Sequence, residues 1–383
     1  MGLSIGVLKE TLPGERRVAI TPKVIDLLAK AGAQVCLEAG AGLESGFADG
    51  DYAAKGATVA ANAAAVAEKA QVLLTVRAPE PAGLVRKGQV VIGFCDPLSE
   101  PQLAAAYAQA GATLFSMELV PRITRAQSMD ALSSMASAAG YKAVLIAANT
   151  LPRLFPMMTT AAGTVPPARV LVLGAGVAGL QAIATARRLG AVVSGYDVRS
   201  AVKEQIESLG AKFVSITIGA GGEGQGGYAR ALTEEEIRSQ RDQMAAVLKE
   251  QDVVITTAAV PGRKAPILVT REMVHGMNPG SVIVDLAAER GGNCEVTQAG
   301  ATVIENGVIV VGPVNLPATV PAHSSQMYAR NIVTFLKNML TKEGALNIDT
   351  ADEITRESLV VLNGEVVNAR VQALLGAGIT AAS

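Results

Sequence analysis

Three glycines stand at the spacing that a dinucleotide-binding turn requires. An apolar run at 170–173 leads into Gly174, Gly176 and Gly179, and a helical pattern follows that ends at Gly190. The first glycine permits a tight turn, the second lets a pyrophosphate approach the backbone, and the third lets the helix pack on the strand. The amino terminus of the helix adds free N–H groups and a positive dipole end. This order of features predicts a dinucleotide site.

An acidic residue follows the glycines at the expected distance. The next apolar run ends on Asp197, about 20 residues further along, which is the usual place for the acid of this motif. A carboxylate there accepts hydrogen bonds from the adenosine ribose hydroxyls, and its charge repels a 2′-phosphate. Asp197 therefore predicts NAD(H) rather than NADP(H) as the bound cofactor.

Strand-like apolar runs alternate with helical patterns through most of the chain. In the first third the runs lie at 4–10, 34–38, 71–76, 89–94 and 112–117. Around and after the glycine turn they lie at 170–173, 191–196, 211–216, 252–258, 281–287 and 308–312. Such alternation is typical of parallel, doubly wound sheets.

Two long helical patterns suggest how the domains are joined. The pattern at 126–150 leads out of the first domain, and the pattern at 323–340 returns to it before a hairpin turned on Asn363-Gly364. We therefore expect an α/β fold of two doubly wound, Rossmann-like parallel-sheet domains separated by a cleft. The first comprises residues 1–134 and 324–383, and the second, the NAD(H)-binding domain, comprises 135–323.

Composition narrows the function classes. The formal net charge of −1 over 383 residues gives no basic surface for nucleic acid or anionic lipid. The three cysteines, Cys36, Cys95 and Cys294, have no ligand spacing, so we expect reduced thiols and no metal site. We expect no signal peptide and no segment that crosses a bilayer. These features predict a cytoplasmic protein without direct membrane insertion.

Two loops leave alternatives open. Six of the nine residues at 219–227 are glycine, and Tyr228 follows. This segment is either a disordered surface loop or a lid that carries Tyr228 to the nucleotide. The segment 117–130 holds Arg122, Gln127 and Asp130 after a strand, so it is either a solvated loop or one that faces the cleft.

Four segments together resemble one family. They are residues 6–22 (GVLKETLPGERRVAITP), 117–130 (MELVPRITRAQSMD), 155–191 (from FPMMTTAAGTVPPARVLVLGAG) and 285–294 (DLAAERGGNC). The family joins alanine dehydrogenases to the NAD(H)-binding component of proton-translocating nicotinamide nucleotide transhydrogenase. The similarity covers essentially the whole chain, and the second and third segments resemble the transhydrogenase branch.

The resemblance implies a role for each matching residue. It assigns the pyrophosphate to the turn formed by Gly174, Ala175, Gly176, Val177, Ala178 and Gly179. It places Asp197, Val198 and Arg199 beside the adenosine ribose. It places Arg122, Gln127, Asp130 and Ser133 around the nicotinamide and its ribose, with Tyr228 on the lid. Thr257, Ala258 and Ala259 complete the expected cofactor contacts.

Acid–base chemistry separates the two branches. An alanine dehydrogenase needs a histidine and a lysine beside an arginine, to move protons and hold a carboxylate. Arg17 matches the shared arginine, but Thr75 stands at the lysine position and Cys95 or Asp96 at the histidine position. The chain's two histidines, which we expect to be structural, are His275 and His323. Direct hydride transfer between two nicotinamides needs position and electrostatics but no such base.

The expected function follows from the resemblance and this difference. We expect an NAD(H)-binding alpha subunit of a transhydrogenase, attached peripherally to the inner face of the cell membrane and forming a homodimer. NADP(H) binding and membrane spanning would belong to partner subunits on separate chains. The alternatives are a stand-alone, alanine dehydrogenase-like enzyme with an altered acid–base set, and a non-catalytic NAD-sensing module.

Overall fold

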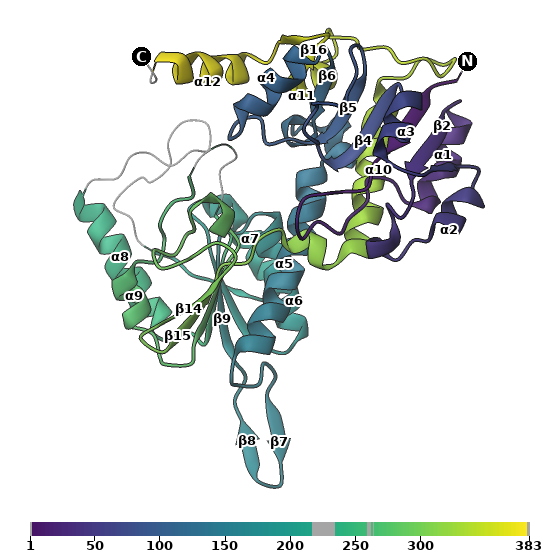
Figure 1. Ribbon diagram of the computed structural model, residues 1–383. Helices are drawn as coiled ribbons and strands as arrows, with labels where there is room; N and C mark the ends of the chain where they lie inside the picture. Colours follow the sequence, from purple (N-terminus) through teal and green to yellow (C-terminus); the bar gives the residue numbers. More distant parts are fainter. Residues whose placement is uncertain (1, 217–233, 259–261, 263, 381–383) are drawn as a thin grey trace. The chain divides into compact units, whose positions relative to one another are not determined.

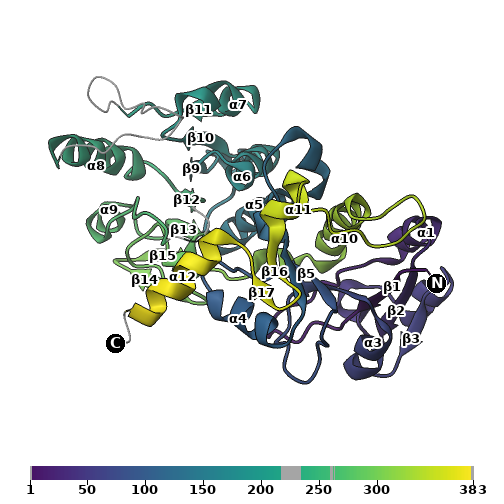
Figure 2. The ribbon, with the colours of Figure 1, turned by 90° about the horizontal axis from the view of Figure 1, so that it is seen from above.

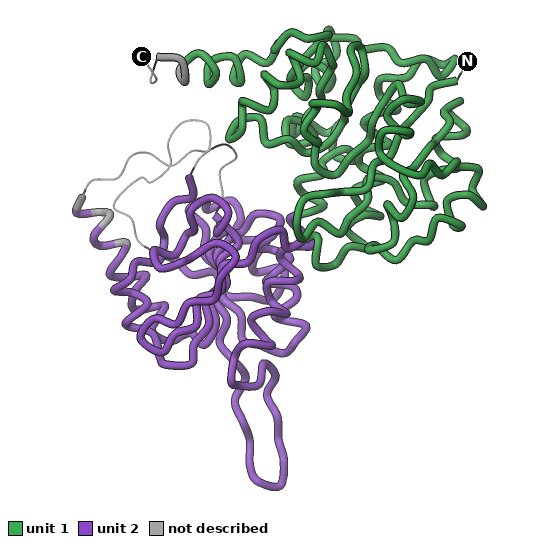
Figure 3. Tube along the Cα trace, viewed as in Figure 1, with its two compact units in different colours: residues 1–135, 317–383 green, residues 136–316 purple. Residues whose placement is uncertain are grey.

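The computed structural model describes residues 2–216, 234–258, 262 and 264–380 of the chain. It divides into two compact units, residues 1–135 with 317–383 (unit 1) and residues 136–316 (unit 2; Figure 3). The return to unit 1 thus lies at 317, where the sequence suggested 324. Tyr228, Ala259 and the proposed lid lie outside the described residues.

Unit 1 is built on one large sheet whose central strands are parallel (Figure 1). In spatial order the strands are β17 (Glu365–Val366), β16 (Leu359–Leu362), β6 (Thr113–Ser116), β5 (Val90–Phe94), β4 (Val72–Arg77), β1 (Ser4–Val7), β2 (Gln34–Glu38) and β3 (Thr58–Ala60). Only β16 and β17 run antiparallel among them. The expected hairpin at Asn363-Gly364 is confirmed, since both residues have positive φ (48° and 93°), as a tight two-residue turn requires.

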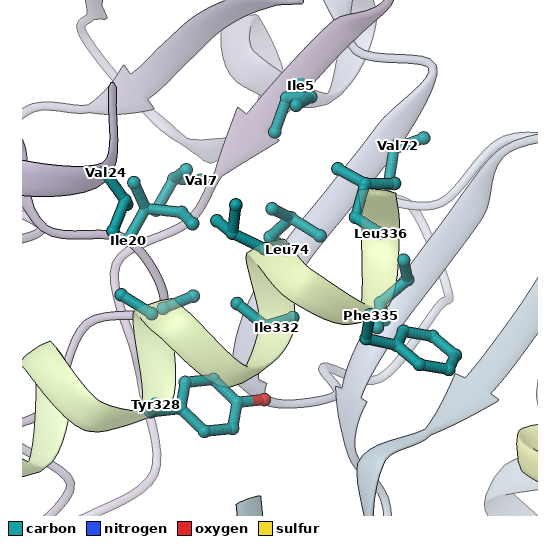
Figure 4. Close-up of a cluster of buried hydrophobic side chains, with 14 of the residues drawn as sticks. Ile5, Val7, Ile20, Val24, Val72, Leu74, Tyr328, Ile332, Phe335 and Leu336 are labelled. Carbon is teal, nitrogen blue, oxygen red and sulfur yellow. The ribbon is translucent and has the colours of Figure 1, made fainter. Parts of the chain in front are cut away.

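Helices cover both faces of this sheet. They are α1 (Pro22–Lys30), α2 (Asp49–Ala53), α3 (Ala63–Lys69), α4 (Pro101–Gln109), α10 (Pro321–Asn338), α11 (Glu353–Ser358) and α12 (Ala369–Thr380), with a short 3-10 turn at Leu43–Ser45. α10, the return helix, fills the core. Its Ile332 and Leu336 are buried among Val7 of β1 and Leu74 of β4 (Figure 4). Burial of such aliphatic side chains supplies most of the stabilisation in a core with few aromatics.

Unit 2 holds the second sheet, seen end-on in Figure 2. In spatial order its strands are β11 (Lys212–Phe213), β10 (Val192–Tyr196), β9 (Arg169–Leu173), β12 (Val253–Thr256), β13 (Val282–Asp285), β15 (Val308–Val311) and β14 (Thr302–Glu305). All pairs are parallel except β14 with β15. The strand order reverses between β9 and β12, and ligands of open α/β sheets bind at such a switch point.

The helices of unit 2 include the predicted dinucleotide helix. They are most of α5 (Ala131–Thr150), α6 (Val177–Arg188), α7 (Lys203–Ser208), α8 (Glu234–Leu248) and α9 (Arg271–His275). Short 3-10 turns lie at Ser200–Val202, Ala288–Arg290 and Leu316–Thr319. The predicted strand at 211–216 is wrong in length, because the described strand ends at Phe213.

The expected single helix over 126–150 is wrong. A 3-10 segment covers Thr124–Met129, Asp130 breaks the regular structure, and α5 begins at Ala131. By length and composition α5 could cross a membrane, contrary to the expectation for the whole chain. However, its Ala143, Val144 and Ala147 are fully buried in the core of unit 2, as in a core helix of a folded domain.

A further hairpin was not expected from the sequence. β7 (Met158–Thr160) and β8 (Gly163–Val165) pair antiparallel and project from unit 2 (Figure 1). Every residue of the two strands is exposed, including Met158 and Val165, which lie opposite each other. The sequence suggested here only a motif of the family.

Candidate functional site

The glycine turn of unit 2 has the geometry that the sequence predicted. Gly174 follows β9 with φ of +99°, and a Cβ at Gly179 would lie 1.8 Å from the carbonyl oxygen of Gly174. Helix α6 therefore rests directly on the turn, which only a glycine allows. A Cβ at Gly176 would meet nothing within 4 Å, so the backbone beside the helix amino terminus borders open space. No side chain caps α6, and a pyrophosphate fits this arrangement.

Asp197 is held by neighbours rather than free. It ends β10, is 9% exposed, and accepts a hydrogen bond from the N–H of Ala175 at 2.8 Å. Arg199 donates to it from Nε and from Nη2, each at 2.9 Å. Burial alone would raise the pKa of Asp197, but the hydrogen bonds from Arg199 and Ala175 outweigh burial and lower it. The carboxylate is thus ionised and already paired, while the neighbouring Val198 is exposed.

This pairing bears on the choice of cofactor. The sequence suggested an unopposed negative charge at Asp197, yet Arg199 offsets that charge in the structure. The side chain of Arg199 is half exposed, so it can swing away from the acid. A ribose hydroxyl therefore competes with a guanidinium for the carboxylate. The spacing of the two residues could have suggested the pair, since i and i+2 side chains at a strand end often meet.

Thr257 joins the neighbouring strand to the glycine turn. It follows β12, and its hydroxyl donates to the carbonyl of Gly174 at 3.0 Å. A Cβ at Gly174 would lie 2.6 Å from this hydroxyl oxygen, so the two backbones are in close contact. Ala258 follows, and its N–H donates to Asn293 at 3.0 Å. The structure therefore brings Thr257 and Ala258 to the same sheet edge as the glycines and Asp197.

The loop predicted to meet the nicotinamide lies in unit 1. Arg122 and Gln127 are exposed, and their side chains make no hydrogen bond to the described parts of the chain. The loop itself is fixed from behind: Asn331 of α10 donates to the carbonyl of Ser128 at 2.9 Å, and Arg125 pairs with Asp352. The sequence did not reveal Asn331 and Asp352, because no local pattern marks contacts so distant along the chain.

Asp130 and Ser133 have a clear structural role. Asp130 accepts the N–H of Ser133 at 2.8 Å and its hydroxyl at 2.6 Å. Since α5 begins at Ala131, this is the N-cap arrangement that satisfies free N–H groups of the first turn. A cap of this kind also fixes where the preceding loop ends, and so where Gln127 lies.

The nucleotide turn is matched by comparison with known proteins. Family models for the N-terminal and C-terminal domains of "Alanine dehydrogenase/PNT" match residues 6–139 and 143–369. The chain belongs to the alanine dehydrogenase/PNT family.

The similarity extends over whole relatives from both branches of the family. The first of the separate chains of "NAD(P) transhydrogenase subunit alpha" in Rhodospirillum rubrum is 45% identical, over 98% of this chain and 100% of that protein. The solved "transhydrogenase from Sinorhizobium meliloti" is 48% identical, with a TM-score of 0.86 over 95% of this chain and 100% of the other. "Alanine dehydrogenase" of Bacillus subtilis is 30% identical, over 97% of this chain and 94% of that protein.

The positions at which the family's two branches differ lie at the sheet edge of unit 1. Arg17 forms a buried, two-pronged ion pair with Glu15, with distances of 2.7 Å and 2.6 Å. Thr75 is buried, and its hydroxyl faces the carbonyl of Ile92 at 3.4 Å. Cys95 is also buried, and burial raises the pKa of its thiol well above the ordinary value. None of these three groups is arranged to exchange a proton with a substrate.

The two histidines are placed elsewhere. His275 pairs with Glu305 at 2.7 Å on the surface of unit 2, and His323 is exposed in the first turn of α10. The titratable group that does stand out at the unit 1 sheet edge is Glu10. Burial raises its pKa to about 7, although the N–H groups of Val76 and Arg77 donate to its two oxygens and act to lower it.

Two glycine substitutions should separate cofactor contact from helix packing. Gly176→Ala adds a methyl group in open space, so unfolding free energy should change by less than about 1 kcal/mol. NADH affinity should nevertheless fall at least about tenfold, because the methyl group lies where the pyrophosphate approaches. Calorimetric titration with NADH and thermal unfolding measure the two quantities.

Gly179→Ala is the matched variant. Its methyl group collides with the Gly174 carbonyl, so α6 must shift and stability should fall by about 1–3 kcal/mol together with NADH affinity. If Gly176→Ala binds NADH like the parent chain, the pyrophosphate does not lie at this turn.

Proposed function

We propose that this chain is the NAD(H)-binding subunit of a proton-translocating NAD(P)⁺ transhydrogenase. The observation that carries the proposal is the whole-length match to the Rhodospirillum rubrum protein, whose name is that of a transhydrogenase subunit. The reaction passes hydride directly between the nicotinamides of NADH and of NADP⁺, the latter held by a partner subunit. A membrane-spanning partner couples this transfer to proton translocation.

Each half of the site has a defined task in this proposal. The glycine turn and the amino terminus of α6 hold the pyrophosphate, while Asp197 and Arg199 hold the adenosine ribose. Gln127 and Arg122 orient the nicotinamide, since their side chains are exposed on a loop that α10 fixes from behind. No residue has to carry a proton, which suits the buried, non-basic groups at Thr75 and Cys95.

The alternative is an alanine dehydrogenase-like reaction, and one observation favours it. Glu10, with a pKa near 7, would be a suitable general base, and Arg17 matches the arginine of that branch. Against it, Arg17 is already paired with Glu15, and both oxygens of Glu10 accept backbone hydrogen bonds. A substrate carboxylate would have to displace Glu15.

The partners follow from the name of the Rhodospirillum rubrum relative. That name describes one portion of an alpha subunit, which implies at least one further portion on another chain. We propose that NADP(H) binding and membrane spanning belong to such partner subunits. This chain would then sit in the cytoplasm, attached peripherally to the inner face of the membrane. α5 does not argue for insertion, because it contributes to the core of unit 2.

We also propose that the chain forms a homodimer through the β7–β8 hairpin. An isolated two-stranded hairpin is marginally stable in water, so it needs a surface to pack on. Met157, Met158 and Val165 are 63%, 42% and 45% exposed, and exposed apolar groups gathered on one element are typical of an interface. A second copy of the chain supplies the same apolar surface by symmetry.

The function is tested by mixing the purified chain with the NADP(H)-binding component of a transhydrogenase. Hydride exchange between NADH and an NADP⁺ analogue should be rapid and should require both proteins. Pyruvate with ammonia and NADH is the control reaction, and it should show no turnover. Steady oxidation of NADH in the control, without exchange in the mixture, would establish the alternative instead.

Gln127→Asn tests the orienting role. Shortening the side chain moves its amide by about 1.5 Å, and misplacement on this scale can lower a rate roughly a hundredfold. NADH affinity should change little, because most contacts lie at the pyrophosphate and adenosine. The exchange rate should therefore fall while the NADH titration stays close to that of the parent chain. A rate that simply follows weaker NADH binding would show that Gln127 does not position the nicotinamide.

Met158→Asp tests the dimer. A charge on the exposed hairpin should weaken self-association at least about tenfold, because desolvating a carboxylate in an apolar interface is costly. Sedimentation velocity over a concentration series measures the shift toward monomer. Ile304→Asp, at a 70% exposed position on β14, is the control and should leave the dimer intact. A monomeric parent chain would contradict the proposal outright.

A further inference from the structure

A buried carboxylate organises the loops at the carboxyl edge of the second sheet. Asp285, the last residue of β13, is fully buried, and no basic residue within the described part of the chain pairs with it. Its oxygens instead accept hydrogen bonds from Thr256 Oγ1 (2.8 Å), Ala287 N (3.0 Å), Asn293 N (2.8 Å), Cys294 N (3.0 Å) and Thr297 Oγ1 (2.7 Å). A buried charge is tolerated only with such full hydrogen bonding, so the loop after β13 is fixed around Asp285.

Asn293 carries this order to the neighbouring strand. Its own N–H is bound to Asp285, and its side chain reaches Ala258 beyond the end of β12. Oδ1 accepts the N–H of Ala258 at 3.0 Å, and Nδ2 donates to the carbonyl of Ala258 at 2.8 Å. Nδ2 also donates to the carbonyl of Pro266 at 2.8 Å. One side chain therefore satisfies both backbone polar groups of Ala258.

The residue beside Ala258 is the one that contacts the glycine turn. Thr257 donates to the carbonyl of Gly174, and its hydroxyl oxygen would lie 3.1 Å from a Cβ at Gly179. There is consequently no slack between this segment and the turn. A small displacement of Ala258 would carry Thr257 either into the turn or away from it.

We propose that Asn293 is a positioning residue for NAD(H), acting through the backbone of Ala258. Its exposed fraction is zero, so it does not touch the cofactor itself. It holds the segment after β12 at the one distance from Gly174 that leaves the pyrophosphate cradle open. The inference rests on the proposed function only in that the chain binds NAD(H).

The test compares two losses from the same buried network. Asn293→Ala removes both contacts with Ala258, each worth about 1 kcal/mol, so NADH affinity should fall about tenfold to a hundredfold. Thr297→Val removes one hydrogen bond to Asp285 without touching Ala258. It should lower the melting temperature but change NADH affinity by less than about twofold. Titration of the apo chain with NADH and thermal unfolding give both numbers without any partner subunit.

Three further measurements keep the outcome decisive. Hydrogen exchange at the Ala258 amide should quicken in Asn293→Ala and stay slow in Thr297→Val. In the hydride exchange assay, Asn293→Ala should raise the KM for NADH and leave kcat near the parent value. If Asn293→Ala does not fold, Asn293→Asp keeps the size and the acceptor but loses both donations from Nδ2, and it should also bind NADH more weakly than Thr297→Val.

Two results would overturn the proposal. One is parental NADH affinity in the folded Asn293 variants. The other is a loss of affinity in Thr297→Val as large as that in the Asn293 variants, which would mean that affinity merely follows stability. A parent chain that fails to bind NADH is a different result, and it would remove the proposed function itself.

Discussion

The nucleotide half of this protein depends on one backbone contact, the approach of α6 to the turn after β9. At Gly179 there is no room for even a methyl group beside the Gly174 carbonyl, so the helix starts immediately against the strand end. That contact aims the free N–H groups of the helix along the sheet edge. It also brings the turn within reach of Asp197 through the Ala175 N–H and of Thr257 through its hydroxyl. Neighbouring strands then have to end where these partners are needed.

The sequence predicted this half of the site well because its signals are local. Glycines, the apolar run and the terminal acid all lie within one βαβ unit, where spacing alone fixes which residues meet. The pairing of Asp197 with Arg199 was not predicted. The motif says where the acid lies but does not say what it bonds in the absence of a ligand.

The other half could not be predicted in the same way. Arg125 meets Asp352 across 227 residues and Asn331 meets Ser128 across 203, and no pattern within one segment records such contacts. The break between the 3-10 segment and α5 was missed for a related reason. Alanine and serine at 131–138 suit a helix, whereas Asp130 bonds the N–H of Ser133 and so favours a cap over a helical interior. The exposed β7–β8 hairpin lacks the buried, alternating face that usually reveals a strand.

The Arg199–Asp197 pair has a kinetic consequence. A ribose that binds there exchanges one set of hydrogen bonds for another, because the guanidinium already satisfies the carboxylate. The net gain from the contact is therefore small, while its geometric demand remains strict. During release the arginine can return to the acid as the ribose departs, so the carboxylate need not be left bare and the barrier to dissociation is lowered. A protein that must discharge its nucleotide in every cycle gains from a site that recognises the ribose without holding it tightly.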